Sequence, residues 1–197
     1  MIRVIAWKIF YSLVTLGRFV FANRGPKVWH FAYGANLSPD MWKHRKLTVF
    51  DHHDFVLEDY VLSFTHPSPY KDHGFADILP KDQSQVYGKL LKISIWDMWR
   101  LDALELVPFL NRHHKIWWIH RQQRIFAYRG HVVDRTVRPT PAYVDRMQHA
   151  YTESGLHLLE HAQILRQIPT LTKLRKDRRP FVFCQARINA PIYNHYL

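Results

Sequence analysis

Short runs of β-branched and aromatic residues alternate along this chain with stretches that have helical spacing. We expect each of these runs to form a β-strand, and they lie at residues 28–33, 55–64, 76–79, 86–93, 116–120 and 124–132. A last run at 181–183 is short enough to be a single edge strand. Strands in the middle of a chain with helices interspersed predict a mixed α/β domain.

Capping residues predict where the helices begin. A Ser or Thr at the N-cap accepts a hydrogen bond from the first turn of the helix, and such residues occur here at Ser38, Ser94 and Thr140. The helix after Ser94 is expected to end before Pro108, and the helix after Thr140 to run through Thr152. A further helix is expected at residues 156–167.

Residues 1–25 predict a separate helix that is apolar nearly all round. Its polar residues follow one thin stripe, formed by Lys8, Ser12, Thr15 and Arg18. Only nine uncharged residues separate Lys8 from Arg18, too few for a comfortable bilayer span, and Lys8 would interrupt the apolar region of a signal peptide. Two alternatives remain open: a helix at a membrane surface, and a helix packed on its own domain.

The composition is that of a globular protein with a strong positive charge. The chain has 197 residues, 47% of them hydrophobic, and a net charge of +12. Such a field attracts anionic lipid, nucleic acid or acidic substrates, unless it serves only solubility. Basic residues cluster at both ends, so we expect contact with an anionic membrane surface through residues 1–25 and 173–179 as one alternative; nucleic acid is the less favoured partner.

A single cysteine, Cys184, limits both the compartment and the metal chemistry. It excludes an internal disulfide and a cluster of thiolate ligands, so a reducing compartment is the simpler interpretation. We therefore expect a cytoplasmic protein, with peripheral membrane contact left open.

The turn after the first predicted strand is a candidate anion site. The strand at 28–33 runs into Gly34, and a helix begins after Ser38. A glycine-containing loop that feeds a helix presents free backbone N–H groups at the positive end of the helix dipole, where a carboxylate or phosphate can bind. Such turns also occur with nothing bound.

Glu105 is the candidate acid or base. It follows Met98 by seven residues and Leu101 by four, so it shares their apolar helix face. Burial and the C-terminal end of the helix dipole would both raise its pKa, as general acid/base catalysis near neutral pH requires. The alternative is that Glu105 lies in water at the helix end. Asp102 is expected to point elsewhere and to cap the helix or face solvent.

Five motifs resemble, in order and spacing, those of the γ-glutamylcyclotransferase family. The segment His30–Leu37 is similar to the family's F-A-Y-G-S-N-L opening. The other four are Gly74–Ile78 (G-[GF]-A-x-I), Val86–Leu91 (V-x-G-x-[VL]-[LYW]), Leu101-Asp102-x-x-Glu105 (L-D-x-x-E), and Ala127-Tyr128 together with Pro139–Tyr143 (a strand tyrosine and P-S-x-x-Y). The resemblance covers about 140 residues, and we assign residues 26–169 to this domain, with 1–25 and 170–197 as extensions.

The resemblance implies a fold, a reaction and a set of site residues. The fold is a small mixed β-barrel flanked by helices. The reaction needs no metal or cofactor: the α-amine of a γ-glutamyl compound attacks its own γ-carbonyl and releases 5-oxoproline and an amine. Glu105 would be the acid/base, and the substrate-binding residues would be Tyr33, Gly34, Ala35, Asn36, Leu37, Tyr128 and Tyr143.

The chain departs from the family pattern at two places beside the predicted pocket. Ala35 replaces the serine of the opening motif, and Leu106–Leu110 replaces a segment that usually contains glycines. These departures support a rival hypothesis, a non-catalytic or altered-specificity member of the fold that is held at a membrane or nucleic acid by its basic ends.

Residues 157–161 read H-x-x-E-H, which is a zinc-hydrolase pattern. That class needs a further glutamate ligand downstream, and no glutamate follows Glu160. We therefore expect no zinc site there.

Overall fold

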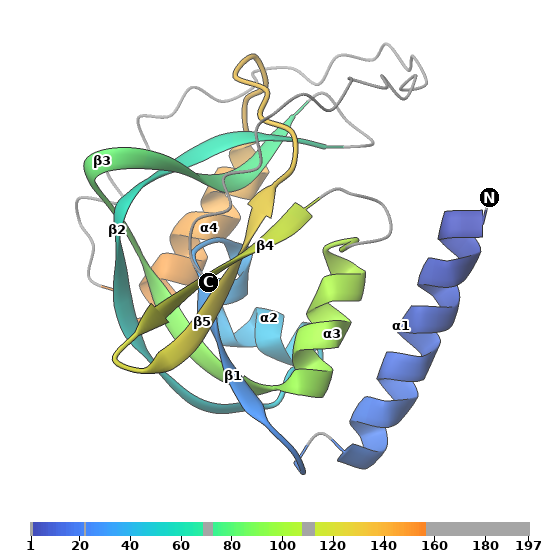
Figure 1. Ribbon diagram of the computed structural model, residues 1–197. Helices are drawn as coiled ribbons and strands as arrows, with labels where there is room; N and C mark the ends of the chain where they lie inside the picture. Colours follow the sequence, from blue (N-terminus) through green and yellow to red (C-terminus); the bar gives the residue numbers. More distant parts are fainter. Residues whose placement is uncertain (1, 22, 69–72, 108–112, 157–197) are drawn as a thin grey trace.

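The computed structural model describes residues 2–21, 23–68, 73–107 and 113–156 (Figure 1). Its helices are α1 (Ile2–Phe21), α2 (Pro39–His44), α3 (Ile95–Leu104) and α4 (Pro141–Glu153), with one 3₁₀ turn, η1 (Ala35–Leu37). Its strands are β1 (Lys27–Ala32), β2 (Val49–Pro67), β3 (Gly74–Ser94), β4 (His113–His120) and β5 (Gln123–Gly130). The mixed α/β class predicted from the sequence is confirmed.

The strands form one five-stranded mixed sheet in the order β2-β3-β1-β5-β4. β1 is the central strand and pairs antiparallel with β3 and parallel with β5, while the remaining pairs are antiparallel. The sheet is strongly curved (Figure 1). Its two edge strands approach each other at Phe55 and His120, whose ring centroids lie 5.2 Å apart. The predicted barrel is thus a curled sheet.

β2 and β3 are longer than the hydrophobic runs predicted. The runs at 76–79 and 86–93 belong to the single strand β3, and β2 begins at Val49 instead of near Phe55. The pairs His52-His53 and His113-His114 lie outside the predicted runs, and both belong to strands, β2 and β4. An edge strand with a solvent-facing side can carry polar residues, so the hydrophobic pattern alone misses its ends.

The predicted helix starts are confirmed by their capping bonds. The side-chain oxygens of Ser38, Ser94 and Thr140 each accept a hydrogen bond from a backbone N–H in the following turn. α3 ends before Pro108 as expected, and α4 ends at Glu153. The helix predicted at 156–167, the strand at 181–183 and the basic segment 173–179 lie outside the described residues, apart from Leu156.

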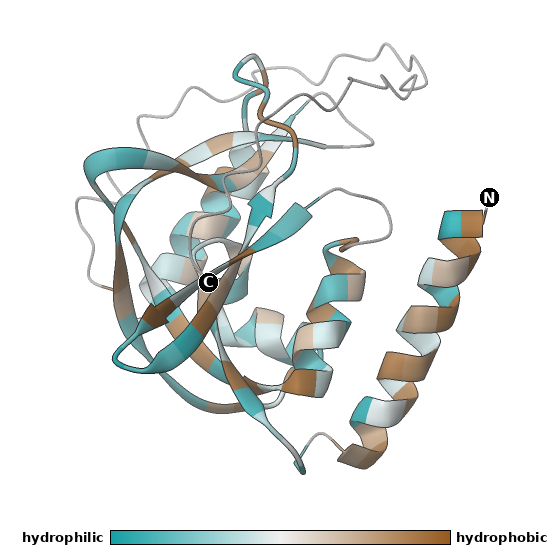
Figure 2. Ribbon diagram, viewed as in Figure 1, coloured by the Kyte–Doolittle hydropathy of each residue, from teal (hydrophilic) through white to brown (hydrophobic). Residues whose placement is uncertain are grey.

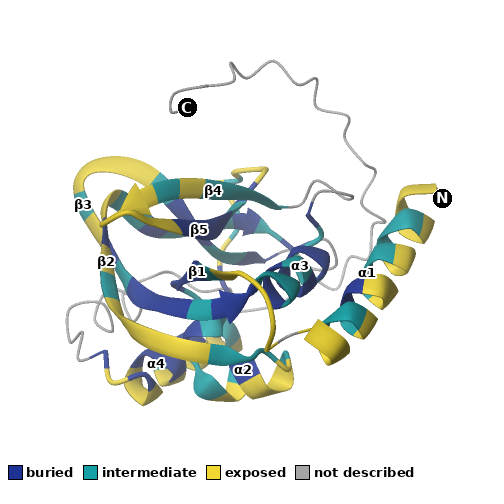
Figure 3. Cartoon of the chain, turned by 60° about the horizontal axis from the view of Figure 1, so that its bottom comes forward, coloured by how far each residue is buried: buried dark blue, intermediate teal, exposed yellow. Residues whose placement is uncertain are grey.

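The core lies between β1, β3 and β5 on one side and α3 and α4 on the other. Its fully buried side chains include Phe31, Leu91, Leu101, Phe126 and Met147. Figures 2 and 3 show the hydrophobic, buried stretches of the central strands beside these helices. This packing fixes the end of β1 and the end of α3, the two elements that carry the predicted site.

α1 packs against α3 outside this core. Trp7 donates a hydrogen bond from Nε1 to the backbone oxygen of Ala103 at 2.7 Å, and Arg18 forms an ion pair with the fully buried Asp97. Val14 is the one α1 side chain that is buried among those described. The alternative of a helix packed on its own domain is therefore realised on one side of α1.

Candidate active site

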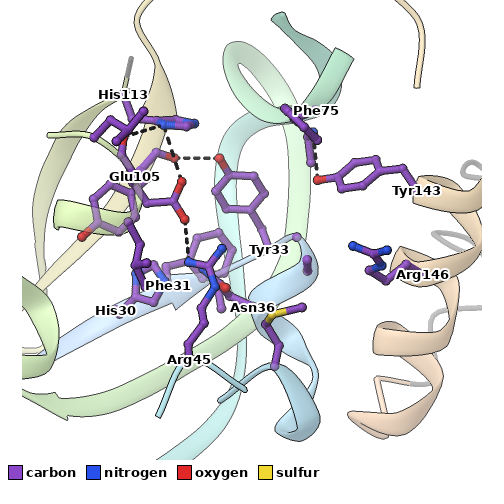
Figure 4. A pocket seen from close by; sticks show the side chains of 18 residues that line it. His30, Phe31, Tyr33, Asn36, Arg45, Phe75, Glu105, His113, Tyr143 and Arg146 are labelled. Atoms are coloured by element: carbon purple, nitrogen blue, oxygen red, sulfur yellow. Dashed lines mark hydrogen bonds and ion pairs between the residues drawn. The ribbon is translucent and has the colours of Figure 1, made fainter. Parts of the chain in front are cut away.

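A pocket of about 490 Å³ opens where β1 runs into η1, beside the C-terminal end of α3 and facing α4 (Figure 4). This volume suits a small ligand. Seven of the eight predicted site residues line it: Tyr33, Gly34, Ala35, Asn36, Glu105, Tyr128 and Tyr143. The eighth, Leu37, lies in the core with no exposed surface. Its N–H donates to the Gly34 oxygen at 3.0 Å, so this amide is already used within the turn.

The Glu105 carboxylate faces this pocket from the C-cap of α3 and is held by two basic side chains. Oε1 accepts a hydrogen bond from Arg45 Nη1 at 2.7 Å. Oε2 lies 3.5 Å from His113 Nδ1, a longer contact. Only 17% of the glutamate side chain is exposed, so the alternative position in open water is not the one observed.

These neighbours reverse the predicted direction of the Glu105 pKa shift. Burial raises the pKa of the carboxyl group, as expected, but the positive charge of Arg45, the nearby His113 ring and the hydrogen bond from Arg45 together lower it below its ordinary value. The prediction of a raised pKa was therefore wrong. That prediction took account of burial and of the helix dipole. It did not take account of a cation beside the carboxylate.

Arg45 and His113 were missed by the sequence analysis. Arg45 is the C-cap residue of α2, and its backbone oxygen accepts a hydrogen bond from Arg100 Nε at 3.0 Å. His113 begins β4, and its ring is tilted against that of His66 with 4.2 Å between ring centroids. A buried carboxylate requires a cation nearby, but with 28 Lys and Arg residues the sequence does not indicate which one supplies it.

His30 lies behind the carboxylate and stays uncharged. It is buried on β1, where its ring stacks on Phe126 with 4.8 Å between centroids. Burial lowers the pKa of His30 to about 4, so its imidazole is neutral at physiological pH. It lines the pocket as an aromatic, uncharged surface.

The loop after β1 lines another part of the pocket and has hydrogen-bonding groups with no partner among the described residues. The first backbone hydrogen bond of η1 is donated by the Leu37 N–H. The N–H groups of Ala35 and Asn36, which come before it, therefore take no part in the turn's own hydrogen bonds. Gly34, the N-cap, provides no side-chain cap. The Asn36 Oδ1 atom is buried and has no donor within the described part of the chain. These groups can bind a carboxylate or a polar ligand atom.

The three predicted pocket tyrosines differ in how far their hydroxyl groups are occupied. Tyr33 donates to the Tyr128 backbone oxygen at 2.7 Å, and Tyr128 donates to Asp102 Oδ1 at 2.6 Å. Tyr143 accepts from the Ala76 N–H at 3.2 Å, so its own proton can be donated to a ligand. Burial raises the pKa of Tyr143 to about 12, which keeps that proton in place.

Asp102 was predicted to cap the helix or to face solvent, and it does not face solvent. It is buried, accepts the Tyr128 bond, and pairs with Lys115 Nζ at 2.8 Å. The Asp102 carboxylate therefore positions Tyr128 and the start of β4 from behind the pocket wall.

The mouth of the pocket adds a second cation. Arg146 is exposed on α4 and lines the pocket across from Glu105 (Figure 4). No acidic partner pairs with it among the described residues. With Arg45 and Arg146 against one glutamate, the pocket favours a ligand that carries negative charge.

Within the described ranges, no group of three or more His, Cys, Asp or Glu side chains could hold a metal ion. The H-x-x-E-H segment at 157–161 lies outside those ranges. The segment 108–112, which contains most of the altered loop after Glu105, also lies outside them; Leu106, at its start, lines the pocket.

The fold is shared with solved structures of other proteins. A structure described as a γ-glutamyl cyclotransferase matches with a TM-score of 0.59 at 20% identity, over 75% of this chain and 91% of that one. The chain has the γ-glutamylcyclotransferase fold. An uncharacterized protein from Homo sapiens matches with a TM-score of 0.58 at 21% identity, over 76% and 92% of the two chains. YkqA from Bacillus subtilis matches with a TM-score of 0.56 at 15% identity, over 80% and 60%.

The sequence itself matches no protein-family model and no curated protein. The shared γ-glutamylcyclotransferase fold confirms the architecture that the five motifs predicted. Identities of this size establish the fold alone.

Proposed function

We propose that this protein cyclises a γ-glutamyl amine, peptide or related amide to 5-oxoproline and a free amine. The observation that carries the proposal is the position of Glu105. Its carboxylate lines the same pocket as the Gly34–Asn36 loop. A γ-glutamyl group has a carboxylate for the loop and an ammonium group for the glutamate, separated by one carbon.

The lowered pKa makes Glu105 a base that is ionised at neutral pH. Arg45 occupies Oε1 at 2.7 Å, whereas the contact of Oε2 among the described residues is the 3.5 Å one with His113. Oε2 is therefore the oxygen that can accept the proton of the substrate's α-ammonium group. A glutamate so paired is a weaker base than one in an apolar pocket, and the negative charge it retains attracts the ammonium group.

The reaction then proceeds without an external reagent. The neutral α-amine attacks the γ-carbonyl carbon, which forms the ring C–N bond and a tetrahedral intermediate. The bond from that carbon to the leaving nitrogen breaks as the proton held by Glu105 passes to this nitrogen. The ring nitrogen then gives its extra proton to the released amine, which leaves as an ammonium ion, and Glu105 is again ionised. Because nucleophile and carbonyl belong to one molecule, positioning by the pocket supplies much of the rate.

Tyr143 and the η1 loop are suited to positioning. The Tyr143 proton is available for the substrate, and the amides of Ala35 and Asn36, which have no acceptor among the described residues, suit its α-carboxylate. Tyr128, whose hydroxyl is bound to Asp102, contributes its ring to the wall.

A panel assay tests the proposal. The purified full chain is incubated with γ-glutamyl dipeptides, γ-glutamyl amines and glutathione, and 5-oxoproline is measured by mass spectrometry. We expect 5-oxoproline and the matching amine in equal amounts from at least one compound. Binding of γ-glutamyl compounds without turnover of any of them would contradict the proposal and identify a binding protein.

A further inference from the structure

The side of α1 that points away from α3 is apolar along its whole length. Six aliphatic side chains there have exposed fractions between 50% and 82%: Ile2, Ile5, Ile9, Leu13, Leu16 and Val20. At about 100° per residue, they fall within an arc of about 80°. We call these six residues the outer face of α1. Figures 2 and 3 show α1 as a hydrophobic helix whose exposed side lies away from α3.

The opposite side of α1 is fixed to the domain over most of its length. The contacts begin at Trp7, continue through Arg18, and end where Phe21 stacks on Trp96 with 5.6 Å between ring centroids. They extend along about 21 Å of the helix axis. Gly17 permits the close approach, because a Cβ atom there would clash with the Trp96 ring. The direction of the outer face is thereby set by the fold.

The charged residues of α1 and of the segment just after it are all basic. α1 contains no acidic residue. Arg3 and Lys8 are exposed along its first half, and Arg24 and Lys27 are exposed just beyond its C-terminal end. An apolar face bordered by basic side chains complements a bilayer surface that carries anionic headgroups.

We propose that the outer face of α1 binds in the plane of an anionic phospholipid bilayer and holds the domain at that surface. The six aliphatic side chains enter the boundary between headgroups and acyl chains. The exposed cations contact lipid phosphates. This docking surface is independent of the proposed reaction, since none of its residues lines the pocket.

The contacts with α3 distinguish lying on the membrane from crossing it. α1 has 20 residues and, by length and composition, could span a bilayer. It is the one helix in the described part of the chain of which this is true. A spanning α1 would carry the buried Asp97 and Arg100 of α3 into hydrocarbon or lose its contacts with them. Both outcomes are costly. An in-plane orientation keeps every one of these contacts.

A second copy of this chain is a poorer occupant of the outer face. If two copies paired through their outer faces, each α1 would bring basic side chains to the contact and no acidic side chain. Such an arrangement places like charges together at the contact.

Co-sedimentation with vesicles tests the proposal on the full chain. One set of vesicles is pure phosphatidylcholine, and the other contains about one-third phosphatidylserine. The test variant is Leu13→Gln with Leu16→Gln, which removes apolar surface, adds no charge and retains helix propensity. The matched control, Ile119→Gln with Val132→Gln, makes the same kind of change at two exposed aliphatic residues outside α1.

We expect the wild type and the control variant to sediment with the anionic vesicles and to be released as salt rises from about 0.1 M to about 1 M. The outer-face variant should bind at least about tenfold more weakly while its melting temperature stays unchanged. Four results would overturn the proposal: no sedimentation with either vesicle, equal loss in both variants, resistance to extraction by alkaline carbonate, or a dimer in light scattering that the outer-face variant dissociates.

Discussion

Arg45 Nη1 lies 2.7 Å from Oε1 of Glu105, so a cation from the end of α2 meets the carboxylate at the end of α3. The two residues are 60 positions apart in the chain. The pair changes the chemistry expected of Glu105, because the carboxylate is ionised in the resting site and one of its oxygens is already occupied. The other oxygen is left for the substrate.

Replacing Arg45 should shift the pH profile of turnover. As a base, Glu105 must be ionised, so activity rises as the pH passes through its pKa, which Arg45 holds below the ordinary value. In Arg45→Gln, burial becomes the dominant influence and raises that pKa, so the acidic limb of kcat/KM should move to higher pH. The matched control is Lys43→Gln, an exposed position on α2, and its profile should coincide with that of the wild type. An unchanged acidic limb in Arg45→Gln would show that Glu105 does not titrate in the reaction.

The same pair predicts a pH-dependent stability difference. The folded-state pKa of Glu105 is depressed, so the ion pair stabilises the fold above the unfolded-state pKa and loses this effect as the pH falls through the folded-state pKa. The melting temperature of Arg45→Gln should therefore be lower than that of the wild type near pH 7, and the gap should close in strongly acidic buffer. A gap of constant size across this range would show that Arg45 acts through packing alone.

Side chains of increasing size at Gly34, just after β1, test whether the Gly34–Asn36 loop binds the carboxylate. A Cβ atom at Gly34 would lie 3.6 Å from the Ala76 Cβ and 4.0 Å from the Tyr143 hydroxyl, which is ordinary contact. Gly34→Ala should therefore fold normally, whereas the larger side chain of Gly34→Val should extend into the pocket and abolish 5-oxoproline binding. Isothermal titration calorimetry with 5-oxoproline measures the binding, and thermal melting confirms the fold. Unimpaired binding by Gly34→Val would exclude this loop as the carboxylate site.

The attachment of α1 is also open to test. Arg18 pairs with Asp97, which is fully buried and accepts further hydrogen bonds from Ser94 and Thr48. Removing a hydrogen bond to such a charged group costs about 2 kcal/mol, so Arg18→Met should lower the free energy of unfolding by about that amount. Lys8→Met, an exposed change on the same helix, should leave it unchanged. Denaturant unfolding measures both, and equal stabilities would contradict the docking of α1 on α3.

Local signals in the sequence predicted the elements that depend on local physics. The N-caps Ser38, Ser94 and Thr140 were recognisable because capping involves neighbouring residues. The placement of Glu105 in a pocket with Tyr143 and the η1 loop followed from the family motifs. What the sequence did not show were contacts made across the fold.

The pairing of Arg45 with Glu105 is such a contact, and its absence from the prediction produced the wrong direction of the pKa shift. His113 lies outside the run predicted at 116–120, because its strand is polar at that end. Leu37 shows the opposite error: it belongs to the opening motif, but its side chain supports the loop from the core.

The central claim is that Glu105 transfers the proton in 5-oxoproline formation, and the most direct measurement is the turnover of Glu105→Gln on the best substrate of the panel. The glutamine retains the size of the side chain and removes its basicity. Loss of a general acid/base should reduce kcat by about 10²–10⁴-fold, with 5-oxoproline still bound and the fold intact by circular dichroism. A kcat within a few-fold of the wild type in the purified, folded variant would contradict the account.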